Sequence, residues 1–173
     1  TIGVEICEDL WMPVPPSSLQ ALAGANVLLN LSGSNELIGK AAWRETLVRS
    51  QSGRCLAAYA YASAGPTESS TDLVFGGHCL IAENGSILAS SNRIGLDGCG
   101  WLEEATATAD IDLQHLAHDR QMTVSWHQAA RRQSAPTYRR ISVGQRSRCV
   151  GEQRSIAAHP FVPRNDNELH ERC

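Results

Sequence analysis

The sequence predicts an α/β fold built on a largely parallel β-sheet with helices packed against it. Two observations predict this class. Apolar, strand-like runs alternate with helical patterns in the order β-α-β-α-β over residues 1–62, which is typical of parallel strands joined by helices. A hairpin signal then follows, with Glu83-Asn84-Gly85 between two short apolar runs, and it adds antiparallel edges to the sheet.

The strands are expected where short apolar runs are bounded by turn-forming residues. They are predicted at residues 1–6, 26–31, 55–62, 78–82, 86–89 and 106–111. The Asn84-Gly85 pair between the fourth and fifth runs is the strongest short signal for a type I′ turn.

Three helices are predicted between these strands. The first follows the stiff proline loop at 13–16, with Ser17 or Ser18 as its cap and Gly24 at its end. The second covers about 36–54 and the third 113–122. In the second helix one face is shared by Ala41, Glu45, Val48 and Ser52.

The bulk properties describe an ordinary globular domain. Of the 173 residues 42% are hydrophobic and the net charge is −3, so neither a nucleic-acid partner nor a membrane is expected. None of the six cysteines forms a C-x-x-C pair, which argues against structural zinc and favours a reduced, cytoplasmic protein. Because the chain opens at Thr1 directly in a strand-like run, we expect it to be a fragment.

The composition changes after Met122. Residues 123–155 carry seven arginines and one acid. The segment has little apolar periodicity, and Tyr138 is the only aromatic residue among the arginines, too few to favour nucleic-acid binding by stacking. We interpret this segment as a solvated connector or a surface that docks on another subunit. Residues 158–163 then resemble a rigid linker, and residues 167–173 could begin a helix of a following domain.

Cys7 is the candidate nucleophile. It lies at the end of a predicted strand, followed at once by Glu8, Asp9 and a proline-rich loop, and sites in parallel α/β sheets lie at the carboxyl ends of strands. A thiol needs a base or a cation to activate it. No histidine shows a pattern that ties it to Cys7, and the His115–His118 pair is a weak metal candidate. The activator therefore stays unassigned.

The loop after the second strand is the second candidate region. It reads Asn30-Leu31-Ser32-Gly33-Ser34 and also lies at a predicted carboxyl edge. Ser34 can donate and accept hydrogen bonds, and Lys40 offers a cation, so together they could hold a zwitterionic substrate. For the serines taken alone, a turn with a helix cap is an equally good interpretation.

These segments resemble the nitrilase superfamily. The resemblance rests on the Cys7-Glu8-Asp9-Leu10-Trp11 run, the 29–34 loop, and Phe75-Gly76-Gly77-His78 leading to Glu83-Asn84-Gly85. More narrowly, the chain looks like the glutamine amidotransferase domains of glutamine-dependent NAD synthetases. The resemblance extends over nearly the whole chain and is strongest over 1–122.

The resemblance implies a fold and a set of site residues. The family fold is an α-β-β-α sandwich, of which 1–122 would be the C-terminal part and 123–173 a connector to an absent synthetase domain. Cys7 matches the nucleophile, and the backbone N–H of Glu8 would donate to the oxyanion. Contacts to glutamine match Glu8, Trp11, Ser34 and Lys40, although relatives tend to carry Arg at the last position. The family's catalytic Glu and Lys lie upstream of the nucleophile.

The resemblance also implies the partners. The substrate would be L-glutamine, and the ammonia released would convert deamido-NAD to NAD with ATP. ATP and Mg²⁺ would bind in the absent domain, with no cofactor or metal in this segment, and a homo-oligomer is expected. Two alternatives stay open: a stand-alone nitrilase-type amidohydrolase acting on another amide, and a non-catalytic interaction domain that kept the fold.

Overall fold

The structure is a computed structural model that describes residues 1–91, 93, 106–133 and 136–144. The chain divides into two compact units, Thr1–Val143 and Gly144–Cys173, and the fold described here is that of the first. The predicted linker at 158–163, the possible helix at 167–173, and three of the six cysteines lie outside the described residues.

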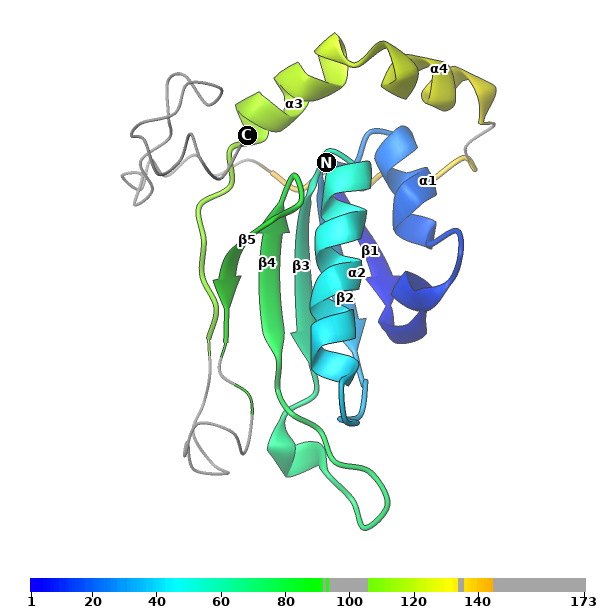
Figure 1. The fold of residues 1–173 in the computed structure, drawn as a ribbon. Coiled ribbons are helices and arrows are strands. Elements are labelled where there is room, and N and C mark those ends of the chain that lie inside the picture. Colours follow the sequence, from blue (N-terminus) through cyan, green and yellow to red (C-terminus); the bar gives the residue numbers. More distant parts are fainter. Residues whose placement is uncertain (92, 94–105, 134–135, 145–173) are drawn as a thin grey trace, which may run out of the picture. The chain divides into compact units, whose positions relative to one another are not determined.

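Five strands form one mixed sheet in the order β1-β2-β3-β4-β5 (Figure 1). They are β1 (Ile2–Ile6), β2 (Val27–Ser32), β3 (Ala58–Ser63), β4 (Cys79–Glu83) and β5 (Ser86–Ser90). β1, β2 and β3 pair in parallel, whereas β4 pairs antiparallel with both β3 and β5. The predicted combination of a parallel sheet with an antiparallel hairpin is therefore confirmed.

Four α-helices and two 3₁₀ turns complete the described fold. They are η1 (Cys7–Trp11), α1 (Pro16–Leu22), α2 (Lys40–Arg54), η2 (Pro66–Glu68), α3 (Leu113–Met122) and α4 (Val124–Arg132). α1 and α2 cover one face of the sheet, and α3 and α4 lie across the end where β1–β3 begin (Figure 1). The helix α4 was not predicted. None of the helices in the described ranges is long and apolar enough to cross a bilayer.

The start of α1 differs from the prediction. The helix begins at Pro16, with Pro15 in the cap position and no side-chain cap, so neither serine caps it. The Ser17 N–H instead donates to the Glu5 carboxylate at 2.8 Å. The buried Glu5 carboxylate on β1 therefore accepts the free N–H at the start of the helix, the role that we assigned to a serine hydroxyl.

The start of α2 also differs from the prediction. The helix begins at Lys40 rather than near residue 36, because Gly39 adopts a left-handed conformation with φ of 79°. The expected face is present at Ala41, Val48 and Ser52, but Arg44 is fully buried beside them, whereas Glu45 is only half-buried.

Two strand predictions need correction. β3 begins at Ala58 because the chain turns at Leu56, where φ is 43°. Residues 106–111 form no strand. At the end of that segment the Asp112 N–H donates to the Glu83 carboxylate at 2.7 Å, so a side chain rather than a neighbouring strand satisfies this backbone donor.

The hairpin between β4 and β5 is confirmed. Asn84 and Gly85 both have positive φ, 47° and 85°, as a type I′ turn requires. The turn packs on the last turn of α2, where the Gly85 N–H donates to the Ser52 hydroxyl at 3.2 Å.

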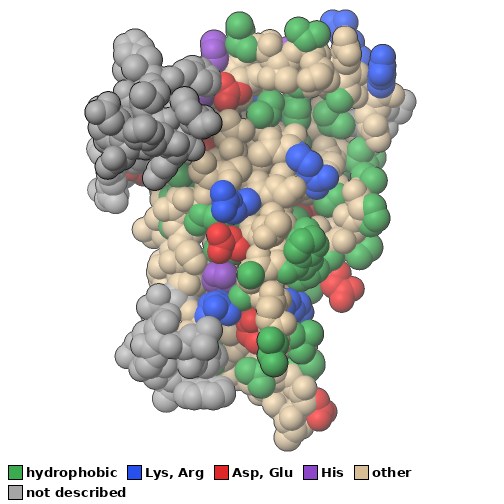
Figure 2. Space-filling view, in the orientation of Figure 1, with side chains coloured by type: hydrophobic (Ala, Val, Ile, Leu, Met, Phe, Trp, Pro, Cys, Tyr) green, Lys and Arg blue, Asp and Glu red, His purple; other side chains and the backbone are tan. Residues whose placement is uncertain are grey.

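Helices cover one face of the sheet, whereas apolar side chains are exposed on the other. The helix-covered face holds the core, with Leu28, Tyr59 and Leu80 almost fully buried. Figure 2 shows the molecule from this side, where charged and apolar side chains are interspersed. On the opposite face Ile2, Val4, Ile6 and Leu31 are each at least half exposed. We call these four residues the bare face.

Candidate active site

Cys7 stands at the carboxyl end of β1 in an unusual backbone conformation. It is the first residue of the turn η1 and has φ of 51°, in the left-handed region. A non-glycine residue held there is strained by about 1–2 kcal/mol. The backbone of Cys7 is therefore held away from both the strand and the helix conformations.

Asn30 holds this conformation from the neighbouring strand. Its side-chain Oδ1 accepts the Cys7 N–H at 3.2 Å, and its Nδ2 donates to the Cys7 carbonyl at 3.3 Å. Asn30 is 1% exposed. One buried amide therefore satisfies both backbone groups of the cysteine.

The turn after Cys7 is fixed by two further contacts. The Asp9 carboxylate accepts the Ile6 N–H at 2.8 Å, and Leu10 is buried in the core. The Glu8 side chain is exposed, and its N–H donates no hydrogen bond to any residue that the structure describes. A free backbone donor therefore stands directly beside the thiol.

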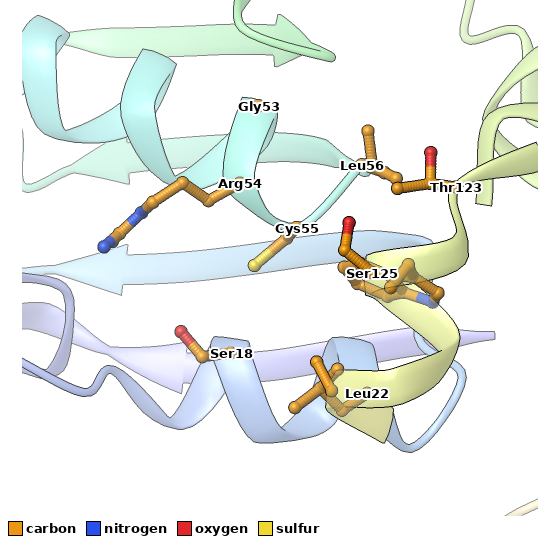
Figure 3. Close-up of a pocket in the computed structure, with 10 residues that line it drawn as sticks. Ser18, Leu22, Gly53, Arg54, Cys55, Leu56, Thr123 and Ser125 are labelled. Atoms are coloured by element: carbon orange, nitrogen blue, oxygen red, sulfur yellow. The ribbon is translucent and has the colours of Figure 1, made fainter. Parts of the chain in front are cut away.

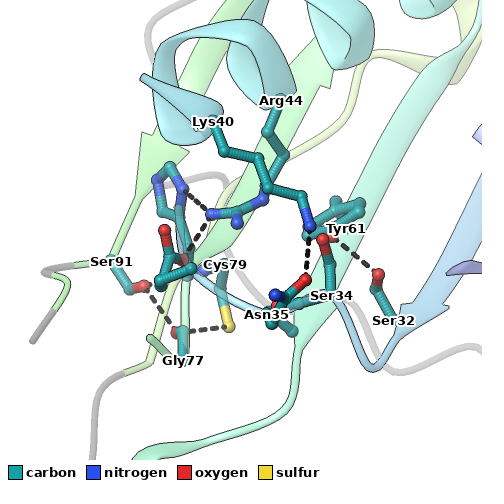
Figure 4. Close-up of polar contacts among 12 residues, drawn as sticks. Ser32, Ser34, Asn35, Lys40, Arg44, Tyr61, Gly77, Cys79 and Ser91 are labelled. Atoms are coloured by element: carbon teal, nitrogen blue, oxygen red, sulfur yellow. Dashed lines mark hydrogen bonds and ion pairs between the residues drawn. The ribbon is translucent and has the colours of Figure 1, made fainter. Parts of the chain in front are cut away.

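In the loop after β2, Lys40 binds Asn35, the residue that follows Ser34 (Figure 4). Ser34 is buried, and the Lys40 Nζ donates to Asn35 Oδ1 at 2.8 Å. The same Nζ lies 5.5 Å from the centre of the Trp11 ring, within the range of a cation–π contact. The cation thus joins the turn after β1 to the start of α2.

A buried ionic cluster beside this loop was missed by the sequence interpretation. Arg44 Nη1 lies 2.8 Å from Glu36 Oε1 and 3.1 Å from His78 Nδ1, and its guanidinium stands over the Tyr61 ring. One signal could have found it, because Arg44 lies four residues before Val48 on the face that we expected to be buried.

The neighbours of His78 determine which ring nitrogen carries its proton. Arginine can only donate, so His78 Nδ1 is the acceptor and Nε2–H donates to the Ser90 hydroxyl at 3.2 Å. Burial, reinforced by the Arg44 charge, lowers the pKa of His78 to about 4. The imidazole is therefore neutral at physiological pH.

Glu5 is a second polar group that the sequence interpretation did not single out. It is 2% exposed and accepts hydrogen bonds from the Ser17 N–H and the Tyr59 hydroxyl. Burial and the nearby Glu5 carboxylate raise the pKa of Tyr59. Both oxygens of Glu5 are engaged, so it is structural, and no hydrogen bond to the Cys7 thiol is found among the described residues.

The metal candidates show no coordination cluster. His115 Nε2 lies 3.4 Å from the Asp119 carboxylate on α3, as an ordinary surface pair. Within the described ranges no group of three or more His, Cys, Asp or Glu side chains could hold a metal ion.

A hollow of about 420 Å³ lies at the other end of the sheet (Figure 3). Its lining includes Leu22, Cys55, Leu56 and Trp126. Burial raises the pKa of the Cys55 thiol to about 11, so this cysteine is not a thiolate at neutral pH. Cys55 precedes β3 whereas Cys7 follows β1, so the two thiols lie at opposite ends of the parallel strands.

Comparison with known proteins identifies the relatives of the chain. A family model described as carbon-nitrogen hydrolase matches residues 1–121. A glutamine-dependent NAD(+) synthetase of Mycobacterium leprae is 43% identical over 180 residues, and one of Mycobacterium tuberculosis is 41% identical over 174. Each alignment covers 99% of this chain but 25% of the relative, so the chain spans about a quarter of the length of these proteins.

Solved structures agree on the fold. Nit3 of Saccharomyces cerevisiae, a member of the nitrilase superfamily, aligns over 71% of this chain and 41% of its own, with a TM-score of 0.54 and 25% identity. A glutamine-dependent NAD+ synthetase of Acinetobacter baumannii aligns over 66% and 20%, with a TM-score of 0.55 and 21% identity.

Proposed function

Since this chain belongs to the carbon-nitrogen hydrolase family, we propose that it carries the nucleophile of a glutamine-hydrolysing domain in a glutamine-dependent NAD synthetase. The observation that supports this most is the left-handed turn at Cys7, which we call the elbow. Its backbone is strained, and it holds the thiol beside the free N–H of Glu8 at the carboxyl end of a parallel strand. The mycobacterial relatives, both glutamine-dependent NAD(+) synthetases, align with nearly the whole chain.

The proposed reaction is an acyl transfer through a thioester. The Cys7 thiolate attacks the side-chain amide carbon of glutamine, and the negative charge that develops on the carbonyl oxygen is met by the Glu8 N–H. The C–N bond then breaks, and the nitrogen leaves as ammonia with the proton that the thiol gave up to its base. Water cleaves the thioester, which releases glutamate and restores the thiol.

The groups that activate the thiol are proposed to lie outside this chain. As the family resemblance implies, a Glu base and a Lys precede the nucleophile. The absence of any hydrogen bond to the Cys7 thiol among the described residues agrees with this assignment. Lys40 does not take this role, because it follows the nucleophile in the chain, at the position where relatives tend to carry a glutamine-binding Arg.

Glutamine binding is assigned to the surfaces around the elbow. Lys40 provides the cation for the substrate carboxylate, and Ser34 provides a hydroxyl. Trp11 supports Lys40 through its ring, and Glu8 lies next to the nucleophile. These assignments follow the family resemblance and the contact between Trp11 and Lys40.

The bare face supports the proposal that the chain is the C-terminal part of an α-β-β-α sandwich. An apolar sheet face needs cover, and a second sheet would pack there. Residues 123–173 would connect to a synthetase domain that binds ATP, Mg²⁺ and deamido-NAD. We propose that the whole protein is cytoplasmic and a homo-oligomer.

Replacement of the nucleophile in the full-length protein tests the proposed function. Cys7→Ala should abolish NAD formation from glutamine and leave NAD formation from an ammonium salt within about twofold of the wild type. Cys79→Ala is the matched control, because Cys79 is another half-buried free thiol and should affect neither reaction.

Three results would contradict the proposal. Equal loss of both reactions in Cys7→Ala would make the cysteine structural. Hydrolysis of an amide other than glutamine by the wild type would favour the stand-alone amidohydrolase. Lack of any amidase activity in the wild-type full-length protein would favour the non-catalytic interaction domain.

A further inference from the structure

The left-handed turn at Cys7 takes this residue out of the sheet. β1 and β2 pair in register as far as Ile6 and Leu31, and the ladder stops there. The N–H and carbonyl of Cys7 therefore lose the strand partners that a continuing ladder would supply, and buried backbone groups need partners. The partners that they find are the two ends of the Asn30 side chain.

Only a short amide side chain can bind both the N–H and the carbonyl of Cys7 in this way. The site needs one acceptor and one donor at the same end of a side chain, and Asn and Gln alone carry both in fixed geometry. Gln is longer by one methylene. The Asn30 side chain is itself held in place, because it is 1% exposed on the helix-covered face of the sheet.

This contact also decides which backbone donor faces the substrate. Asn30 Oδ1 occupies the Cys7 N–H, so the next N–H along the turn, that of Glu8, is the one left free. We propose that Asn30 is a positioning residue for the nucleophile, which holds Cys7 in the left-handed conformation and thereby fixes the thiol relative to the Glu8 N–H. The inference rests on the proposed function and adds a residue to it.

The test replaces Asn30 by Leu, which keeps the branched shape and removes both hydrogen bonds, and by Ala as a second variant. In the full-length protein we expect kcat for glutamine hydrolysis to fall by about 10- to 100-fold, because small misplacements of a reacting group have effects of that size. KM should change by less than about threefold. Hydrogen exchange of the Cys7 amide should speed up by at least about tenfold.

Two controls separate positioning from folding. Ser52→Ala also removes a buried side chain that makes two backbone hydrogen bonds, to Ala57 and Gly85, at the other end of the sheet. It should change neither kcat nor exchange at Cys7. Alkylation of the buried Cys55 reports opening of the fold and should stay as slow in the Asn30 variants as in the wild type.

Each contrary outcome overturns the proposal. A kcat within about threefold of the wild type, or an effect on KM alone, would show that the two hydrogen bonds of Asn30 do not position the thiol. Rapid Cys55 alkylation in both variants would assign Asn30 to the fold alone. If the wild type cleaves another amide instead of glutamine, the proposed substrate fails, while kcat on that amide and the exchange rates still decide the role of Asn30.

Discussion

Arg44 and Glu36 form an ion pair inside the protein, with 2.8 Å between Nη1 and Oε1, although the Arg44 side chain has no exposed surface. The Nε and Nη2 atoms of the same guanidinium are buried without a hydrogen-bond partner among the described residues. Loss of one partner from a buried pair leaves an uncompensated charge. The Glu36 carboxylate therefore ties its loop to the buried face of α2, next to the contact that Lys40 makes with Asn35.

Gly76→Ala should break this pair without touching either charge. A Cβ at Gly76 would lie 2.5 Å from Glu36 Oε1, so the carboxylate must move away from Arg44. We expect the free energy of unfolding to fall by about 2–4 kcal/mol, measured by urea denaturation. Gly65→Ala is the control, because no atom lies within 4 Å of its added Cβ. Equal stability of the two variants would show that Glu36 can relax.

Acid should destabilise the fold through His78. The folded pKa of about 4 lies below the ordinary value of 6.5, so only the unfolded chain binds the proton between these values. The contribution of His78 is complete above pH 6.5 and is lost as the pH falls to about 4, by up to about 3 kcal/mol. His78→Gln keeps a donor and an acceptor and should remove this part of the pH dependence. Urea unfolding at about pH 7 and about pH 4 measures the difference, and parallel profiles would contradict it.

Lys40→Arg should improve glutamine binding if Lys40 meets the substrate carboxylate. A guanidinium offers a planar two-donor fork where an ammonium offers a point charge, and it can still stack on Trp11. We expect KM for glutamine to fall by about three- to tenfold with little change in kcat, measured by glutamate release in the full-length protein. Lys40→Met is the opposite control and should raise KM. Equal KM values for all three proteins would remove Lys40 from the binding site.

Arg120→Met should loosen the end of the sheet where β2 and β3 begin. The guanidinium donates to the carbonyls of Ala25, Cys55 and Leu56 at 2.7–3.0 Å and packs on Trp126. Loss of these charged hydrogen bonds should lower the free energy of unfolding by about 2–3 kcal/mol. Arg131→Met on the exposed side of α4 should change it by less than about 0.5 kcal/mol. If the denaturation curves of the two variants coincide, the hydrogen bonds of Arg120 do not stabilise the fold.

The bare face should make the 173-residue chain self-associate when it is produced alone. Val4 and Ile6 are 50% and 64% exposed on the edge strand β1, and apolar edges and faces promote association. Replacing both by Thr should weaken association by at least about tenfold, measured by sedimentation velocity. Leu73→Thr removes a similarly exposed apolar residue outside this face and should have little effect. If Leu73→Thr weakened association equally, the association would not depend on the bare face.

The sheet could be predicted because its signals are local. Each strand is a short apolar run, and Asn84-Gly85 alone determines the hairpin turn. Cys7 and Ser34 could be placed at one edge of the sheet because parallel strands end on the same side. These features need no knowledge of which residues meet across the fold.

The features that could not be predicted depend on contacts between distant residues. The N–H of Ser17 binds a carboxylate 12 residues away, and Arg44 meets His78 over 34 residues. Asn30 lies in the loop that we singled out, but it was given no role for the same reason. Within β2 it occupies an ordinary position, and only the fold shows that its side chain reaches the turn of another strand.

The order of strands in the sheet bears on how the chain acquires its structure during synthesis. Each strand pairs with the next one along the chain, so the sheet can grow one strand at a time behind the ribosome. Arg120 breaks this pattern, because it reaches back 95 residues to the Ala25 carbonyl. The hydrogen bonds of Arg120 can therefore form only after all five strands have been synthesised, and those of Arg140, which reaches back 117 residues to the Ala23 carbonyl, only later still.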